Sequence, residues 1–367
     1  MSVKIIKFIL NRRLQSSMIP QDGEKCTNSE FFKEKVRKAK NIEKNQCLFY
    51  NTYWCVVATK SRINVTVRER YKMRDYCLSC CSTADLSEER FKEYGIRYIP
   101  FHFTLGNTEY VDDCGKSVKP EELYRRMLAG EDAKTSQVTV AEYIKYFEQI
   151  IKSGKDVLHI TLSSGISGSY NSACVARDEL KYEYPDANIY VIDSLAASSG
   201  YGLLIDKMVE LKKGGMSLEE LVEWTEENKL RLHHWFFSSD LTFFIKGGRV
   251  TKTAGFVGNV LNICPMLNVN FEGKLIPREK IRGTNKAIKR AVELMQQHAE
   301  NGLDYDGKVY ISNSECLDDA SKEAALIEDE FKKLNGKVEI FPIGAVIGSH
   351  TGPGTVALFF WGDKRED

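Results

Sequence analysis

Residues 156–173 read DVLHITLSSGISGSYNSA, and this stretch decides the fold. Its first seven residues, 156–162, are apolar on both faces, as expected for a strand buried inside a parallel sheet. A turn rich in serine and glycine follows, and residues 168–183 have the pattern of a helix. A buried strand, a tight turn and a helix in this order indicate a layered α/β protein.

The same alternation of strand-length and helix-length segments extends outward in both directions. Upstream, the pattern predicts strands at 76–81 and 96–103, with helices near 87–94 and 121–128 and a helix at 139–151 that opens with capping-box spacing. Downstream, it predicts a strand at 189–192 and helices at 200–212 and from 217, the last with capping-box spacing. After about residue 230 the alternation loosens and ends in the apolar strand 355–361.

We therefore predict an α/β fold of two domains. Residues 73–235 form a first α/β domain with a mainly parallel, layered sheet, and residues 236–367 form a second α/β domain. Residues 1–72 are a basic N-terminal extension that the fold does not need, because Met73 opens a sequence like an ordinary protein start. Apolar residues of the helix 200–212, such as Tyr201 and Leu204, are expected in the core, and a role in lining a tunnel stays open.

Composition excludes several classes of protein. The 367 residues are 43% hydrophobic and 28% charged, which excludes a largely disordered chain. No run approaches 18 apolar residues, and the start lacks a signal-peptide core, so we expect a cytoplasmic protein without a membrane-spanning helix. Ten cysteines in a chain of this length do not make a disulfide scaffold.

The net charge of +1 conceals an asymmetry between the extension and the rest of the chain. Residues 1–72 hold 16 Lys and Arg against 6 Asp and Glu, and residues 73–367 hold 36 against 45. The acidic body argues against nucleic-acid binding. A regulator that binds nucleic acid or a membrane would depend on the basic extension alone.

Common enzyme motifs fail along the chain. There is no phosphate-binding loop and no strand–GxGxxG–helix unit. The segment 165–169, GISGS, resembles a nucleophile elbow but has its second glycine one residue too early. A lipid hydrolase or acyltransferase using Ser167 is the alternative to a binding protein.

The sequence predicts no metal site. The cluster Cys77, Cys80 and Cys81 lacks a second pair at zinc spacing, so we expect it to pack in the core. His233 and His234 are neighbours on a strand and must point to opposite faces, so the pair cannot chelate one ion simply.

Four polar segments are candidates for recognition. The turn 163–168 delivers backbone N–H groups to a helix start beyond the carboxyl end of a strand, where an anion is favoured. A serine that merely caps its helix explains the same pattern. Residues 134–138, KTSQV, and 246–249, KGGR, are further polar loops, and 348–354, GSHTGPG, is expected to be a glycine-rich turn.

These segments resemble the DegV family. The chain carries STADL at 82–86, KTSQ at 134–137, SSGISGSYNS at 163–172, KGGRV at 246–250 and GSHTGPG at 348–354, in the order found in that family. The resemblance covers about residues 76–361. It implies a two-domain DegV-like α/β fold that buries a fatty acid in a lipid tunnel of the first domain, with the carboxylate near the interdomain cleft.

The resemblance also implies a function. The protein would bind a long-chain fatty acid without a covalent bond, use no cofactor, catalyse nothing itself, and present the carboxylate to a separate fatty-acid kinase that forms the acyl-phosphate. No nucleic acid and no stable membrane insertion are implied, whereas transient membrane contact stays open.

Site residues follow from the same resemblance. Thr135 and Ser167 would hydrogen-bond the carboxylate, His350 would approach it from the second domain, and Ser136 and Gly168 would complete the site. Arg249 and Arg282 are candidates for the surface that faces the kinase. One departure is Cys80-Cys81, where the family usually has Thr-Asp.

Overall fold

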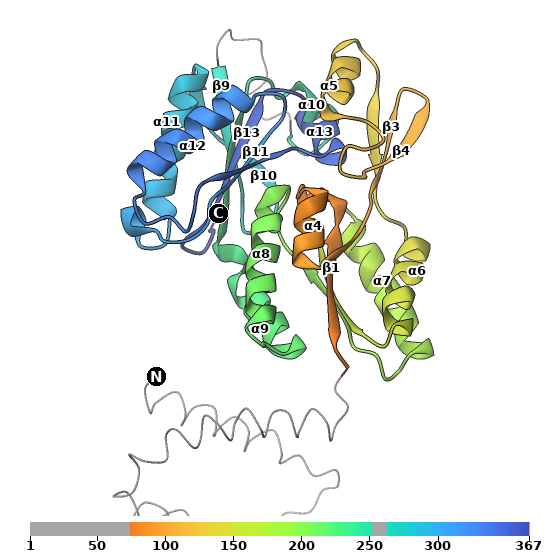
Figure 1. Ribbon diagram of the computed structural model, residues 1–367. Coiled ribbons are helices and arrows are strands. Elements are labelled where there is room, and N and C mark those ends of the chain that lie inside the picture. Colours follow the sequence, from red (N-terminus) through yellow and green to blue (C-terminus); the bar gives the residue numbers. More distant parts are fainter. Residues whose placement is uncertain (1–73, 252–262, 367) are drawn as a thin grey trace, which may run out of the picture. The chain divides into compact units, whose positions relative to one another are not determined.

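The computed structural model describes residues 74–251 and 263–366. These residues form an α/β structure with three sheets (Figure 1). The predicted extension 1–72 and the proposed start at Met73 lie outside the described residues. None of the described helices is long and apolar enough to cross a membrane.

The first sheet has four strands in the order β2-β1-β6-β7, and every pairing is parallel. The strands are β1 (Tyr76–Cys81), β2 (Arg97–Ile99), β6 (Asp156–Thr161) and β7 (Ile189–Asp193). Helices on either side are α4 (Glu88–Tyr94), α6 (Val140–Lys152), α7 (Ser169–Glu183), α8 (Ser199–Lys213) and α9 (Leu218–Asn228). The predicted parallel sheet of the first domain is confirmed.

Both predicted capping boxes are present. The Thr139 hydroxyl accepts a hydrogen bond from Glu142 N at the start of α6, and Ser217 accepts one from Glu220 N at the start of α9. In each case the glutamate carboxylate returns a bond to the N-cap amide, so two exposed N–H groups of each helix are satisfied.

The single strand predicted at 96–103 is wrong. Pro100 divides it, because proline has no N–H to continue a ladder, and Phe101 N instead donates to Ser82 Oγ at 3.1 Å. β2 stays in the first sheet, and the chain then enters a small antiparallel sheet. Its strands, in the order β4-β3-β5, are β3 (His102–Leu105), β4 (Thr108–Val111) and β5 (Ala133–Ser136), with α5 (Pro120–Leu128) after β4.

The largest sheet has six strands in the order β10-β9-β8-β13-β11-β12. Its pairings are antiparallel except for β11 with β12. The strands are β8 (Leu232–Ser238), β9 (Ile263–Val269), β10 (Leu275–Arg282), β11 (Tyr310–Asn313), β12 (Glu339–Pro342) and β13 (Thr355–Trp361). The associated helices are α10 (Thr242–Lys246), α11 (Thr284–His298), α12 (Leu317–Glu330) and α13 (Ala345–Thr351).

β8 spans the domain boundary predicted at residues 235 and 236. The whole strand pairs with β13 and β9, so the chain enters the larger sheet at Leu232. The division into domains at 235 stays a prediction.

The helix α8 lies between the two large sheets (Figure 1). It packs against β8, β11 and β13 on one side and against the turn Ser82–Ala84 after β1 on the other. Tyr201 and Leu204 of this helix are fully buried in the core that joins the two sheets. A second hydrophobic core lies between the larger sheet and the helices α11 and α12.

Candidate functional site

The turn after β6 is fixed against the hairpin between β9 and β10. Ser163 Oγ donates to Gly273 O at 2.8 Å. A Cβ atom at Gly165 would lie 2.7 Å from Glu272 O and from Gly273 O, so a side chain there would displace backbone. A turn of the first sheet is therefore held by a hairpin of the larger sheet, and glycine permits the close approach.

Ser167 stands at the start of α7. Its hydroxyl oxygen accepts a hydrogen bond from Ser169 N at 3.2 Å, and Gly168 is the N-cap residue. Ser167 and Gly168 also line a cavity, described below. A serine that accepts a bond still has its O–H to donate. Ser167 can therefore cap the helix and still donate a hydrogen bond to a ligand, so the two roles that the sequence left open are compatible.

The helix start rests on a buried polar chain that includes Cys81. Ser169 Oγ is hydrogen-bonded to Tyr143 OH at 2.7 Å, and Tyr143 OH to Cys81 Sγ at 3.3 Å. Burial raises the pKa of the Cys81 thiol to about 11, so it stays protonated at neutral pH. Cys77, Cys80 and Cys81 are all buried in the core, which confirms the predicted packing role.

Thr135 and His350 are far apart in the sequence and contact each other in the fold. Thr135 belongs to β5 and His350 to α13, and their Oγ1 and Nε2 atoms are 2.8 Å apart. The expectation that 348–354 is a turn is wrong for its first half, because residues 345–351 form α13 and only Gly352 and Gly354 adopt positive φ. His350 comes from the later part of the chain, and the structure brings it next to Thr135.

The imidazole of His350 is half-buried and is neutral at pH 7. Burial lowers its pKa to about 4, and the nearby charge of Arg249 acts in the same direction. Its Nδ1 atom is buried and has no hydrogen-bond partner within residues 74–251 and 263–366. Gly247 lies so close to Nδ1 that a Cβ atom there would clash with it. A buried nitrogen without a partner is costly and marks a place where a ligand can bond.

The two arginines predicted to face a kinase have different surroundings. Arg249 is half-buried, donates to Ile166 O and Gly247 O, and lines the cavity. Burial lowers the pKa of its guanidinium. Arg282 is exposed at the end of β10 and is not among the residues that line this cavity. Only Arg282 therefore stands on open surface.

Thr135, Ser167 and His350 open into one cavity of about 380 Å³. Ser136, Gly168 and Arg249 also line it, so every predicted head-group residue is brought together. Sequence analysis missed the other polar members, which are Gln137, Ser198, His234, Thr351 and Thr355. The apolar wall is formed by Phe101, Leu162, Ile166, Ala197, Phe236, Phe244, Val269, Leu275, Ile343, Val346, Ile347, Ala357 and Phe359.

Two paired strands supply much of the apolar wall. His234 and Phe236 of β8 face the cavity, and their partners across the ladder, Phe359 and Ala357 of β13, face it too. The alternate residues of both strands belong to the core under α11 and α12. The segment 355–361 is apolar at nearly every position, so the available signal was a strand covered on both faces, and strand geometry then sends alternate residues to opposite faces.

The cavity lies between the half of the described structure that contains the first sheet and the half that contains the larger sheet. The sequence placed the lipid tunnel inside residues 73–235, whereas most of this cavity's apolar wall comes from residues after 235. The reason is that the larger sheet turns one apolar face towards the first sheet. Tyr201 and Leu204 pack in the core and do not line the cavity.

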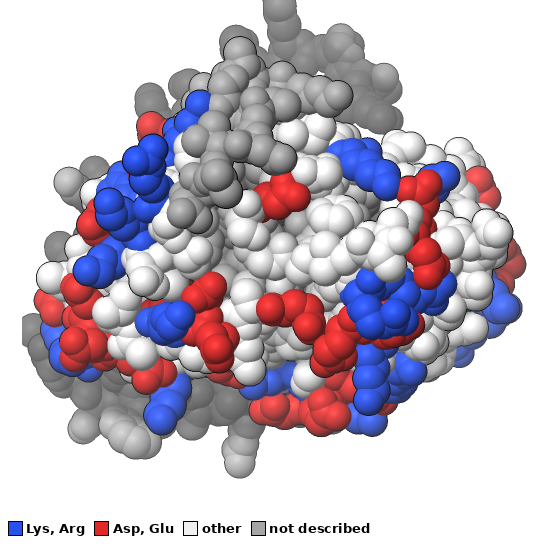
Figure 2. All heavy atoms as spheres, turned by 90° about the horizontal axis from the view of Figure 1, so that it is seen from above, with Lys and Arg blue, Asp and Glu red and all other residues white. Residues whose placement is uncertain are grey.

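The end of the molecule that carries α5, α10 and α13 is seen from above in Figure 2. The described surface there has a broad area without Lys, Arg, Asp or Glu, and charged side chains gather mainly along its margins. α13 carries His350, so the head-group residues lie towards this end.

Comparison with known proteins places the chain. The family described as "Uncharacterised protein, DegV family" matches residues 81–363. A DegV domain-containing protein of Clostridium perfringens is 36% identical over 294 residues, covering 80% of this chain and all of that protein. This chain belongs to the DegV family.

Solved DegV structures share the fold. A stearic acid-binding protein from Eubacterium ventriosum is 27% identical, with a TM-score of 0.69, and the match covers 77% of this chain and 97% of that one. The Streptococcus pneumoniae Fatty Acid Kinase (Fak) B3 protein, loaded with linoleic acid, has a TM-score of 0.68 at 22% identity, covering 79% and 100%. The second likeness concerns the fold alone.

Four of the five DegV segments recognised in the sequence converge on the cavity, and the segment 82–86 does not line it. Residues of the segments 134–137, 163–172, 246–250 and 348–354 all line it. These segments are far apart in the chain, and the fold of the DegV family brings them to one place.

Proposed function

We propose that this protein binds one long-chain fatty acid without a covalent bond and presents its carboxylate to a separate fatty-acid kinase. The observation that carries the proposal is the Thr135–His350 pair at the wall of an otherwise largely apolar cavity. The stearic acid-binding protein from Eubacterium ventriosum supports the ligand class, because it shares the fold and 27% of the sequence.

The polar residues suit a carboxylate head group. An ionised carboxylate only accepts hydrogen bonds. Ser167 can donate its hydroxyl proton, and the Thr135–His350 pair, which uses one of its two protons between its own members, has the other to donate. His350 Nδ1 is buried without a hydrogen-bond partner among the residues that the structure describes. Arg249, half-buried in the same wall, contributes positive charge. Buried charge is costly unless it is paired and hydrogen-bonded, so these groups would hold the carboxylate where several donors converge.

The apolar wall suits an alkyl chain. Burying methylene groups contributes about 0.8 kcal/mol each, so about 14 of them give roughly 11 kcal/mol before ordering costs. This is sufficient for tight binding without a covalent bond. Ligand pockets in proteins are typically about 300–1,000 Å³ and mostly apolar, and a volume of about 380 Å³ lies within that range.

We propose a binding role rather than catalysis. The alternative, a lipid hydrolase or acyltransferase using Ser167, needs a base that activates the hydroxyl. The structure gives Ser167 Oγ a bond from Ser169 N and pairs His350 with Thr135. The other cavity histidine, His234, is bonded to the backbone at Ala197 N and Leu232 O. Arg282 remains a proposed contact with the kinase, and the cytoplasmic location stays a prediction from the sequence.

The decisive experiment is mass spectrometry of the full chain purified from bacteria, with solvent extraction of whatever co-purifies. We expect one C14–C18 fatty acid per chain, reduced in Thr135→Ala and Ser167→Ala. Ser164→Ala is the matched control, since Ser164 lies in the same turn, is exposed and does not line the cavity. An empty protein that takes up neither oleate nor palmitate contradicts the proposal.

The kinase and hydrolase roles are then separated by turnover. With ATP and a fatty-acid kinase from a DegV-containing bacterium, the loaded protein should support acyl-phosphate formation, trapped as the hydroxamate. The protein alone should not hydrolyse p-nitrophenyl esters. Ester hydrolysis that disappears in Ser167→Ala would favour the enzyme instead.

A further inference from the structure

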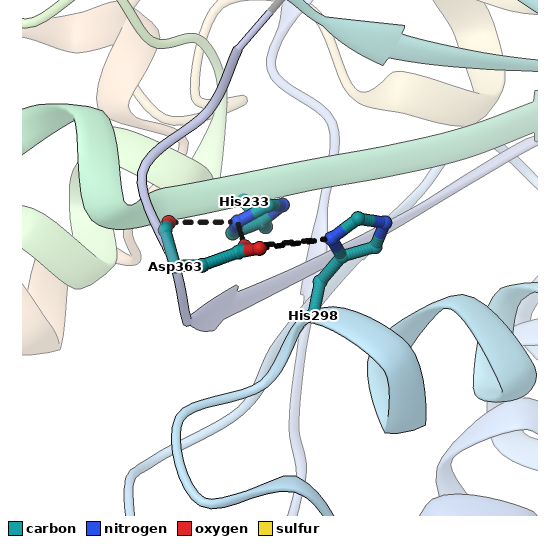
Figure 3. Close-up of side chains that lie close together, drawn as sticks. All are labelled: His233, His298 and Asp363. Carbon is teal, nitrogen blue, oxygen red and sulfur yellow. Dashed lines mark hydrogen bonds and ion pairs between the residues drawn. The ribbon is translucent and has the colours of Figure 1, made fainter.

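Three side chains that are far apart in the sequence meet on the face of the larger sheet that turns away from the cavity. His233 lies on β8, His298 is the last residue of α11, and Asp363 follows β13. Figure 3 shows the Asp363 carboxylate directed towards both imidazoles. His233 Nε2 is 2.8 Å and His298 Nδ1 3.4 Å from Asp363 Oδ1.

We propose that His233, His298 and Asp363 form a binding site for a divalent transition-metal ion such as Zn²⁺ or Co²⁺. One ligand atom from each residue lies within 4.8 Å of the others. Two imidazole nitrogens and one carboxylate oxygen suit zinc and its late first-row neighbours, whereas Mg²⁺ and Ca²⁺ take oxygen ligands. The site is separate from the proposed fatty-acid function and does not depend on it.

The separations are close to those that an ion requires. Zn–N and Zn–O bonds of about 2.0–2.2 Å place neighbouring ligand atoms of a tetrahedral ion about 3.4 Å apart. The His298–Asp363 separation already has that value. The His233–Asp363 separation must widen, and the Asp363 side chain, 62% exposed, has room to move outward.

The rings of both histidines are held in place by stacking. His298 stacks on His233 with centroids 5.1 Å apart and on Trp235 at 5.7 Å. His233 stacks on Phe360 at 5.2 Å, nearly parallel. Rings confined in this way lose little further freedom when they bind an ion, which favours binding.

The backbone that carries Asp363 is also fixed. Gly362 N donates to Arg231 O at 2.8 Å and Asp363 N to His298 O at 3.1 Å. A Cβ atom at Gly362 would clash with His298 O and lie 2.9 Å from His233 Cδ2, so the close approach requires glycine. An ion would therefore join a strand, a helix end and this segment at a preformed position.

The three ligands leave room for solvent at the ion. His233 is buried, His298 is one-third exposed, and Asp363 faces outward, so the site opens to solvent on one side. Water would complete the coordination there, as in zinc sites with three protein ligands. Nε2 of His233 is also 3.0 Å from Asp363 O, so the ion replaces a proton that this nitrogen donates in the metal-free protein.

A single histidine–carboxylate pair elsewhere provides the control. His102 Nε2 is 2.7 Å from Glu142 Oε1, with His102 partly exposed, and this pair is not part of a grouped set of ligands within the described residues. Neither residue lines the cavity. A histidine–carboxylate ion pair alone should not bind the metal.

The test is a titration of the full chain, without an affinity tag and after removal of metal by a chelator, with Co²⁺ and Zn²⁺. We expect one ion per chain, an increase in melting temperature with Zn²⁺, and quenching of Trp235 fluorescence by Co²⁺. Asp363→Ala and His298→Ala should weaken binding at least about tenfold. His102→Ala should bind as the wild type does, and Mg²⁺ at the same concentrations should have no effect.

Three results would overturn the proposal. These are no Zn²⁺ binding by the wild type, equal binding by Asp363→Ala, and an equal loss in His102→Ala. Asp363 is exposed, so its variant should fold even if the histidine variants do not. Fatty-acid content, measured in the same samples, should be unchanged in Asp363→Ala, which separates this site from the cavity.

Discussion

Some buried polar side chains in the described part of the chain cost folding free energy, because they lack a hydrogen-bond partner. Glu323 of α12 is fully buried, and neither of its carboxylate oxygens has a hydrogen-bond partner in the described part of the chain. His350 carries an unpaired buried nitrogen beside Gly247. The first feature affects stability, and the second concerns the head-group site, so the two lead to different measurements.

Glu323 should make stability depend on pH. Burial raises its pKa from 4.5 to about 8, so between these values the folded chain keeps a proton that the unfolded chain releases. The stabilisation is full below about pH 4.5 and is lost as pH rises through 8, by at most roughly 5 kcal/mol.

The replacement Glu323→Gln removes this charge. We expect the free energy of unfolding of the variant to exceed that of the wild type at pH 9 and to match it closely at pH 5. Urea denaturation across this range measures the difference. A difference that does not vary with pH would show that Glu323 does not titrate as argued.

Gly247→Ala should weaken ligand binding through His350. The added methyl group would collide with Nδ1 and turn the imidazole away from Thr135. We expect fatty-acid affinity to fall about tenfold, the equivalent of one lost hydrogen bond of roughly 1.4 kcal/mol.

Gly248→Ala is the control for this variant. Gly248 has a φ of 72° and no neighbour within 4 Å of an added Cβ. Its replacement should lower stability by about 1 kcal/mol and leave affinity unchanged. Isothermal titration measures the fatty-acid affinity of both variants, and thermal denaturation measures their stability. Equal affinity in the two would contradict the role given to His350.

At the scale of elements, α8 joins the two large sheets. Its Asp206 is buried and accepts both a hydrogen bond from Tyr94 OH and a two-pronged contact from Lys308 Nζ, 2.8 Å from each carboxylate oxygen. Tyr94 comes from α4 beside the first sheet, and Lys308 precedes β11 of the larger sheet. One carboxylate therefore connects three parts of the fold.

Asp206→Ala should destabilise the protein. The variant leaves the Lys308 ammonium and the Tyr94 hydroxyl without this partner, and breaking such a pair typically costs about 3 kcal/mol. Lys207→Ala is the matched control, since the neighbouring Lys207 forms only an exposed pair with Glu210. Its effect should stay below about 0.5 kcal/mol. Chemical denaturation of the two variants tests the contrast, and equal effects would refute it.

At the scale of the whole molecule, the cavity lies between the two halves, so a ligand there contacts both. A fatty acid that binds the folded chain and not the unfolded chain should stabilise the fold by about 2.7 kcal/mol at a ligand concentration one hundred times its Kd. Thr135 of β5 and His350 of α13 contact each other in the cavity wall, and their contact is the link that the ligand would strengthen.

Removal of residues 1–72 should leave this stabilisation intact. The DegV match begins at residue 81, and the cavity is lined by residues from Phe101 onward. We expect a chain that starts at Met73 to bind oleate with the affinity of the full chain and to show the same increase in melting temperature. A loss of binding would give the basic extension a role in ligand capture.

Much of the fold could be predicted from local patterns. The buried strand 156–162, the turn and the helix after it were visible because apolar periodicity and turn residues act over short distances. The capping boxes at Thr139 and Ser217 are local as well. Pro100 also carried a local signal that the prediction of one strand over 96–103 overlooked.

The candidate site was predictable only in part. Thr135, Ser167 and His350 were named because their segments resemble a family, and the structure brings all three to one cavity. Gln137 stood in a recognised segment, yet nothing in the sequence said that it would pack on Gly168. His234 and Phe236 gave no signal of their own, because which face of β8 meets a cavity depends on what packs there.

Local sequence patterns established the α/β class, the strand, turn and helix of residues 156–183, and the segments that carry polar recognition, since each depends on neighbours in the chain. Tertiary structure alone decided that the cavity lies between the sheets, that Arg249 turns inward, and that His298 and Asp363 meet His233. The physical reason is that strand pairing and sheet packing join residues a hundred or more positions apart, and local patterns do not encode those distances.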